Sequence, residues 1–303
     1  MRRNKLWLAF SMILWGLVLV GSIVIYQGLK DNTLHWPSIS LNPINFDVEV
    51  QTGTSEALSR ISIDWIVGNV TVIGENRTNI EWKEMASGTL SEGQKATFNV
   101  SGDTLNIRSN IRSSFQFLFR RSVSSELILK VPEEMLDSLK IESTSGKVSI
   151  AYVSSKKMDL LATSGSVLIN HSVFEEAKLK MTSGKMDVDN TMIHEAVVEM
   201  TSGKVTMKAE VLQSLDFQMT SGVSEVHLLD PNLSQLEVRM TSGKMEFYLP
   251  EAADFQLITS KTSGSIRVSE DIVEDGSMYW TKNKANTYRL DMTSGSFTLR
   301  LQP

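Results

Sequence analysis

Few side chains in this sequence could do chemistry, and the four histidines are the first candidates. His35, His171, His194 and His227 show no ligand spacing such as His-x-x-x-His, in which two imidazoles share one helix face. The chain of 303 residues contains no cysteine, which excludes thiol catalysis, disulfides and thiolate metal sites. We therefore interpret the histidines as solvated surface residues, and we predict neither a metal site nor a cofactor.

Two glutamates are the best candidates for acid–base chemistry. Glu225 and Glu246 each stand three residues after the glycine of a repeated Thr-Ser-Gly tripeptide. If the repeats stack as neighbouring strands, the carboxylates lie about 5 Å apart, which would suit a retaining glycosidase or a calcium site. The alternative is a pair of exposed glutamates moderated by Lys244 and water. We favour it because no calcium-binding Gly-Gly-x-Gly-x-Asp repeat is present.

A column of serines repeats with the same tripeptide. No histidine or lysine stands at a constant offset from these serines, so nothing indicates an activated nucleophile. We interpret the column as a ladder of hydroxyl groups at a corner of the chain. Its members are Ser145, Ser164, Ser183, Ser202, Ser221, Ser242, Ser263 and Ser294.

A basic and aromatic segment lies between Arg108 and Arg121. Its alternating phenylalanines predict an edge strand that closes the first coil, because period-two alternation needs no partner to explain it. The same side chains would also suit a loop that touches anionic lipid or a partner protein. The residues concerned are Arg112, Phe115, Phe117, Phe119, Arg120 and Arg121.

An internal repeat must position these candidates. Thr-Ser-Gly occurs eight times, and successive glycines are 19, 19, 19, 19, 21, 21 and 31 residues apart. A near-constant period of about twenty residues indicates repeated supersecondary units. The glycines are Gly146, Gly165, Gly184, Gly203, Gly222, Gly243, Gly264 and Gly295.

Apolar residues recur at every second position on both sides of each glycine. The positions seven, five and three before it and two and four after it are mostly apolar, and the third before it is methionine in five repeats. This alternation predicts two strands per repeat that share one interior. Thr-Ser-Gly between them is predicted to be a sharp corner, because glycine accepts the positive φ that such bends often require.

Two architectures fit these columns. In an antiparallel meander Thr-Ser-Gly would be a hairpin turn, whereas in a β-solenoid each repeat is one coil that lies over the coil before it. We favour the solenoid, because only in a solenoid do equivalent residues of successive repeats stack on one another. The predicted fold class is all-β, a single-stranded, parallel β-helix-like β-solenoid of about 19–21 residues per coil, stacked in chain order.

Both ends of such a stack need caps, because open strand edges recruit other strands. Leu58–Gly74 looks like a divergent first repeat, and Ile80–Trp82 and Thr97–Ile107 are predicted to add strands at that end. At the other end, the interval from Ser265 to Asp291 is predicted to form a loop and a cap.

The N-terminal sequence predicts a transmembrane α-helix. No charged side chain occurs from Leu6 to Leu29, and at about 1.5 Å per residue this run can cross a hydrocarbon core of about 30 Å. A cleavable signal peptide would be shorter and end in small residues.

The basic residues before the apolar run place the N-terminus in the cytoplasm. The expected parts are a cytoplasmic tail (1–5), an anchor (6–28), a spacer (29–57) with a short strand at Asn45–Val50, and an extracytoplasmic solenoid (58–303).

Three stretches carry a resemblance to a known family. They are Val67–Gly74, Leu127–Val131 followed by Pro132, and the Ser-Gly-x-Val repeats from Ser145 onward. From about Leu58 to its end the chain resembles the bacterial adhesin-like β-strand-repeat proteins. With its N-terminal anchor it is similar to the LiaG-type membrane proteins of Firmicute cell-envelope-stress operons. The resemblance implies a β-solenoid outside the membrane, a role in envelope stress and no catalytic residues.

Together these features favour a non-enzymatic scaffold or binding module that is anchored at the cell envelope. The expected partners are the lipid bilayer, through the N-terminal helix, and envelope proteins or a cell-wall polymer. A formal net charge of −5 argues against nucleic acid as a partner. The alternative is an envelope glycan-active enzyme built on a β-helix, an idea that rests on fold analogy alone.

Overall fold

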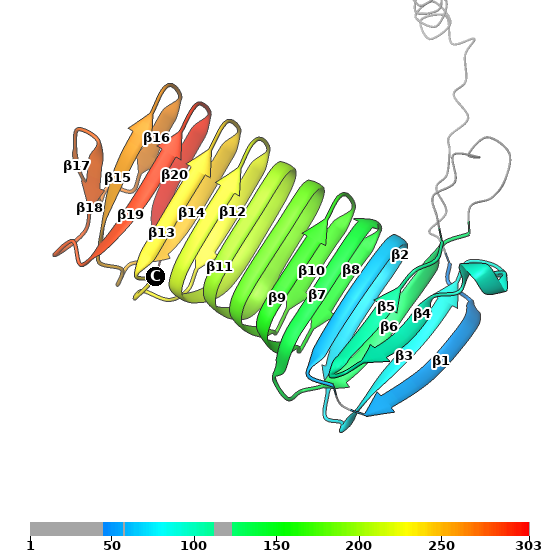
Figure 1. Cartoon of the computed structure of the whole chain (residues 1–303). Helices are drawn as coiled ribbons and strands as arrows, with labels where there is room; N and C mark the ends of the chain where they lie inside the picture. Colours follow the sequence, from blue (N-terminus) through cyan, green and yellow to red (C-terminus); the bar gives the residue numbers. More distant parts are fainter. Residues whose placement is uncertain (1–44, 57, 112–122, 303) are drawn as a thin grey trace, which may run out of the picture. The chain divides into compact units, whose positions relative to one another are not determined.

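A computed structural model describes residues 45–56, 58–111 and 123–302, all of which belong to the compact unit Ile44–Pro303 (Figure 1). The predicted anchor at 6–28 and the segment from Arg112 to Arg121 lie outside the described residues. Within the described ranges, no helix has both the length and the apolar character needed to span a bilayer.

The described part consists of strands and one short 3-10 helix, Glu92–Gln94. In chain order the strands are β1 (Val48–Glu56), β2 (Arg60–Glu75), β3 (Asn79–Ala86), β4 (Thr97–Ser101), β5 (Thr104–Arg108), β6 (Ser125–Pro132), β7 (Leu136–Ser145), β8 (Lys147–Ala151), β9 (Ser154–Ala162), β10 (Ser166–Asn170), β11 (Val173–Met219), β12 (Val223–Leu228), β13 (Gln235–Met240), β14 (Lys244–Pro250), β15 (Phe255–Lys261), β16 (Ser265–Val268), β17 (Val273–Asp275), β18 (Met278–Trp280), β19 (Asn286–Met292) and β20 (Ser296–Gln302).

The repeats form a β-solenoid, as predicted. Each coil contributes a leading strand before Thr-Ser-Gly and a trailing strand after it, and each pairs in parallel with its counterpart in the next coil. The register places Leu139 beside Met158 and Met158 beside Ala177, all seven residues before their glycines. Parallel pairing between coils excludes the antiparallel meander. The long strand β11 passes through two Thr-Ser-Gly corners as one element.

The predicted inward columns form the interior. Met181, Met200 and Met219 are each only 2% exposed, and they belong to one hydrophobic cluster that runs through all the coils. Aromatic rings from different rows also meet in the interior, because Phe247 packs against Phe217 and Phe297 with ring centroids 5.5 and 5.6 Å apart. Burying each such side chain contributes about 1.5–3 kcal/mol, and the chain contains no disulfide that could add to this.

The corner glycines stack backbone against backbone. Gly203 has a φ of 127°, and a Cβ atom added to it would lie 2.1 Å from the carbonyl oxygen of Gly184. A side chain at this position would therefore collide with the neighbouring coil as well as strain its own backbone. Glycine is required here for close approach in addition to its freedom in φ.

The stacking order departs from chain order at the C-terminal end. β19 pairs with β13 on one side and with β15 on the other, and β20 lies in the same way between β14 and β16. In Figure 1 the red strands accordingly lie between the yellow and the orange ones. The prediction that coils stack in chain order is therefore wrong for the last two. The long interval before the final glycine gives the chain enough length to return and fill this place.

The N-terminal end has the same arrangement. β2 contains both strands of one coil, yet it lies between β7–β8 and a coil made of β5 and β6. The predicted divergent first repeat, Leu58–Gly74, is thus the first coil in the chain and the second in the stack. As a consequence, the first and last coils of the chain have paired neighbours on both sides.

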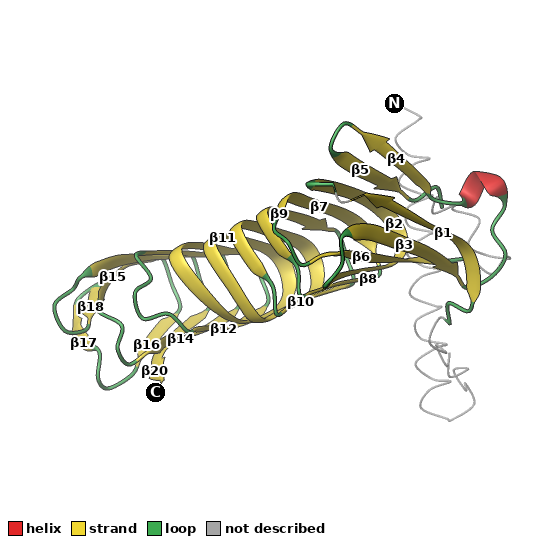
Figure 2. Cartoon of the chain, turned by 90° about the horizontal axis from the view of Figure 1, so that it is seen from below, coloured by secondary structure: helices red, strands yellow, loops and turns green. Residues whose placement is uncertain are grey.

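Antiparallel strands cap the stack at both ends (Figure 2). β3 pairs with β6 and β1 with β3, while β4 pairs with β5. At the other end β18 pairs with β15 and with β17. The predicted caps are therefore present, and the strand expected at Asn45–Val50 is found at Val48–Glu56. Capping strands of this kind reduce the length of open edge that could recruit other chains.

The corner stacking generates a stability prediction. Gly203→Ala should lower the free energy of unfolding by about 3 kcal/mol, because it combines a strained φ with a backbone collision. Urea unfolding followed by circular dichroism measures this change. Gly93→Ala is the matched control, since a Cβ there meets no atom within 4 Å, and it should change stability by less than about 1 kcal/mol. Equal effects of the two substitutions would contradict the close approach.

Candidate binding groove

Six of the eight corner serines donate a side-chain hydrogen bond to the neighbouring coil. The hydroxyl of Ser164 donates to the carbonyl oxygen of Thr144 at 3.0 Å, and that of Ser294 donates to Thr241 at 3.1 Å. Like pairs recur at other corners. The serine column is thus a ladder of hydroxyl groups, as predicted, and each donated proton is directed at a backbone oxygen rather than at a base.

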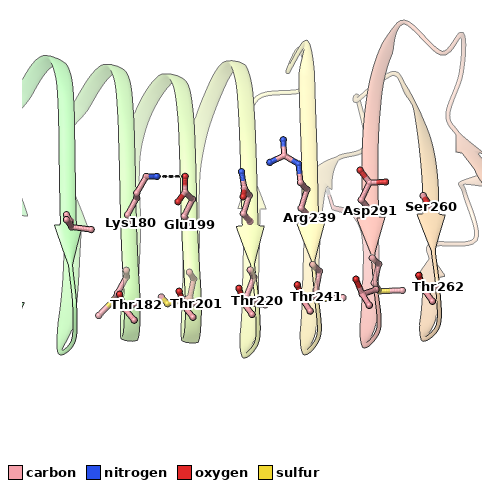
Figure 3. A pocket seen from close by; sticks show the side chains of 18 residues that line it. Lys180, Thr182, Glu199, Thr201, Thr220, Arg239, Thr241, Ser260, Thr262 and Asp291 are labelled. Carbon is pink, nitrogen blue, oxygen red and sulfur yellow. Dashed lines mark ion pairs between the residues drawn. The ribbon is translucent and has the colours of Figure 1, made fainter.

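The threonines of the same tripeptides face solvent. Their side chains form a straight row along the outside of the leading strands, one per coil (Figure 3). In stacking order the row contains Thr182, Thr201, Thr220, Thr241, Thr293 and Thr262. It presents a regular line of hydroxyl and methyl groups about 4.8 Å apart.

A second outward row runs parallel to the threonines, two positions earlier in each leading strand. In stacking order it contains Lys180, Glu199, Gln218, Arg239, Asp291 and Ser260. Lys180 Nζ lies 2.6 Å from Glu199 Oε1 (Figure 3). Arg239 forms an ion pair with Glu237 at 2.9 Å, and this hydrogen-bonded contact raises the pKa of Arg239. The two positive and two negative charges of the row cancel.

The space between the two rows is an open groove of 610 Å³. It crosses the six coils of these threonines, a distance of roughly 24 Å, and its lining reaches Leu161 in the coil before them. The exchanged order of the last coils completes it, because β19 places Asp291 and Thr293 between the residues of β13 and those of β15. The groove is thus continuous, polar and electrically balanced, and it could hold an extended chain with many hydroxyl groups.

The predicted carboxylate pair lies elsewhere, on the trailing strands. Glu225 and Glu246 are register partners on β12 and β14. Each has its own partner within its strand, because Glu225 Oε1 lies 3.1 Å from His227 Nε2 and Glu246 Oε1 lies 2.8 Å from Lys244 Nζ. The hydrogen bond from Lys244 lowers the pKa of Glu246. A glycosidase acid needs a raised pKa instead.

Two of the histidines, His171 and His227, stack on tyrosine rings, and His194 is exposed. His171 stacks on Tyr152 with ring centroids 5.1 Å apart. His227 stacks on Tyr248 at 4.1 Å and has its Nδ1 2.9 Å from Gln302 Oε1. Among the described residues, no three histidine, aspartate or glutamate side chains are close enough to hold a metal ion.

The residues of the groove were missed by sequence reasoning, which concentrated on the serines and the inward columns. One signal was available, because Lys180 and Glu199 carry opposite charges at equivalent positions of successive repeats. The contribution of Asp291 could not be seen in this way, since it depends on the exchanged order of the last coils. The remaining candidate segment, Arg112 to Arg121, lies outside the described residues.

Comparison with known proteins agrees with the architecture. The family model described as Toastrack DUF4097 matches residues 58–300, which include every coil. No curated protein matches the sequence.

Three solved structures illustrate the similarity. A "putative cell adhesion protein" from Clostridium sporogenes is 13% identical, with a TM-score of 0.31 over 83% of this chain and 99% of that one. A "putative adhesin" from Bacteroides fragilis is 11% identical, with a TM-score of 0.40 over 83% and 96%. A "putative lipid binding protein" from Parabacteroides distasonis is 10% identical, with a TM-score of 0.42 over 84% and 98%.

The carboxylate geometry generates a titration prediction. The side-chain carboxyl of Glu246, followed by NMR, should titrate below its ordinary value of 4.5. A lowered pKa stabilises the fold above the unfolded-state value, and this contribution disappears as the pH falls through the folded-state value. Lys244→Met should move the titration back towards 4.5. A Glu246 carboxyl that titrated above its ordinary value would instead support an acid catalyst.

Proposed function

From the premise that this chain belongs to the Toastrack DUF4097 family, we propose that it is a non-enzymatic binding module of the cell envelope. In this proposal the solenoid holds an extended, hydroxyl-rich polymer such as a cell-wall glycan in the groove beside the threonine row. The observation that carries the proposal is the groove itself, an open and charge-balanced channel that crosses six coils.

The chemistry of the groove fits a neutral polar chain better than a charged one. Its threonine hydroxyls can donate and accept hydrogen bonds, and its ion-paired side chains offer further donors and acceptors without a net field. Each coil repeats the same groups about 4.8 Å further along, so a polymer with many sugar units could engage several coils at once. Solenoids suit such extended ligands because their faces are long and regular.

In this proposal the module lies at the outer side of a membrane. The uncharged run from Leu6 to Leu29 and the basic residues before it support an anchor with its N-terminus in the cytoplasm. The resemblance to LiaG-type proteins extends the proposal to a role in envelope stress.

Deletion of residues 6–28 should release the protein from membranes in cell fractionation, and retention of the deleted form would contradict the anchor.

The competing candidate is a glycan-cleaving enzyme. The one observation in its favour is the register pairing of Glu225 with Glu246. The separate side-chain contacts of the two carboxylates and the lowered pKa of Glu246 count against it, since a carboxyl that acts as the general acid needs a raised pKa.

Co-sedimentation with purified peptidoglycan tests the proposed function. Thr201→Val combined with Thr220→Val should weaken binding about thirtyfold, because each of the two lost hydrogen bonds costs about 1 kcal/mol. Binding should persist in about 0.5 M salt, because salt screens interactions between charges and a neutral ligand makes few of them.

The matched control is Thr144→Val combined with Thr163→Val. These threonines occupy the same corner row but do not line the groove, so their loss should leave binding unchanged. Equal effects of the two pairs, or no binding by the unaltered protein, would contradict the proposal. Release of new reducing ends, abolished by Glu225→Gln with Glu246→Gln, would favour the enzyme.

A further inference from the structure

The corner opposite Thr-Ser-Gly exposes apolar side chains. At this second corner the trailing strand of one coil turns into the leading strand of the next. Tyr152, Val173 and Met192 are 54%, 38% and 39% exposed there. Two neighbouring hollows of 450 and 400 Å³ both have Val173 and Met192 in their lining, and we treat the depression that the pair makes as one surface. We call this depression the second-corner groove.

The backbone at this corner is firmly held. Tyr152, His171 and Asn190 have φ angles of 58°, 48° and 47° in three successive coils, a conformation that costs roughly 1–2 kcal/mol for such residues. The buried Ser172 hydroxyl donates to the Asn170 carbonyl at 2.9 Å and accepts from the Val153 amide at 3.2 Å. The groove is therefore preformed, so a ligand would pay little for ordering it.

A rim of carboxylates surrounds the apolar surface. The groove is lined by Glu175, Glu176, Glu195 and Glu210. Lys157 reaches Glu176 at 3.3 Å, whereas the neighbouring Lys156 is held by Asp137 at 2.7 Å. Among the ion pairs of the described residues, none involves Glu195 or Glu210. The surroundings of the groove therefore carry a net negative charge.

We infer that the second-corner groove binds a basic, amphipathic peptide segment of a partner protein. Apolar side chains of the peptide would cover Tyr152, Val173 and Met192, and its lysines or arginines would pair with the glutamates of the rim. The groove extends over five coils, from Tyr152 to Leu229, or roughly 19 Å, which fits about six extended residues or about 13 helical ones.

Charge decides against two other occupants. An anionic lipid surface attracts basic patches and is repelled by a rim of glutamates. A second copy of this chain, with its net charge of −5, offers no general attraction to an acidic groove. The second-corner groove is also apolar and lies at the opposite corner of the coil from the threonine row, so the inference does not rest on the proposed glycan-binding function.

Fluorescence anisotropy with the full-length protein tests the inference. The probe is a labelled peptide of about six residues that alternates lysine with leucine and spans roughly 19 Å when extended. This peptide should bind, and peptides that replace lysine by glutamate or leucine by serine should bind at least about tenfold more weakly, because each lacks one of the two complementary features.

Substitutions then locate the site. Met192→Ser should weaken binding about fivefold to tenfold, and Glu195→Gln with Glu210→Gln should weaken it and reduce its salt dependence. Val223→Ser and Glu134→Gln are the controls, since these residues are exposed and lie outside the groove, and neither should alter binding.

Four results would overturn the inference. They are equal binding of the glutamate–leucine peptide, equal effects of the groove and control substitutions, stronger binding to phosphatidylglycerol vesicles than to the peptide, and a concentration-dependent dimer that Met192→Ser disrupts. The last two would assign the groove to a membrane surface or to a second copy of the chain.

Discussion

The structure depends on backbone-to-backbone contact at the glycine corners. Gly184 and Gly203 approach so closely that no side chain fits between their coils, and the parallel pairing on both sides of the corner then repeats in register. Because every coil is held one strand spacing from the next, each residue lies beside its own counterpart. Inward positions become continuous apolar rows and outward positions become continuous surface rows.

The two surfaces proposed to bind ligands are both consequences of this register. The threonine row and the charge-balanced row beside it form a polar groove near the glycine corner, whereas the opposite corner carries an apolar groove with an acidic rim. The two proposals thus assign a polymer and a protein segment to opposite corners of one module.

Sequence periodicity was sufficient to predict the structure of each coil but not the order in which the coils stack. The alternation around each glycine predicted which side of Met181 or Phe217 is buried, because a period of two and a fixed repeat leave one consistent interior. It could not predict that β19 enters between β13 and β15, since the parallel register is satisfied equally well in either order. The stacking order depends on the caps and on the protection of open strand edges. The position of Asp291 in the groove is a consequence of that order.

Cysteine cross-linking tests the stacking register and the exchanged order most directly, and the chain has no cysteine of its own. Glu237 and Arg289 are register partners on β13 and β19, and Arg289 lies between Glu237 and Ile258. Under mild oxidation, Glu237→Cys with Arg289→Cys should form a disulfide, because neighbouring strands lie about 4.8 Å apart. Glu237→Cys with Ile258→Cys should remain reduced at roughly twice that spacing. The opposite result, with the second pair linked and the first reduced, would contradict the account.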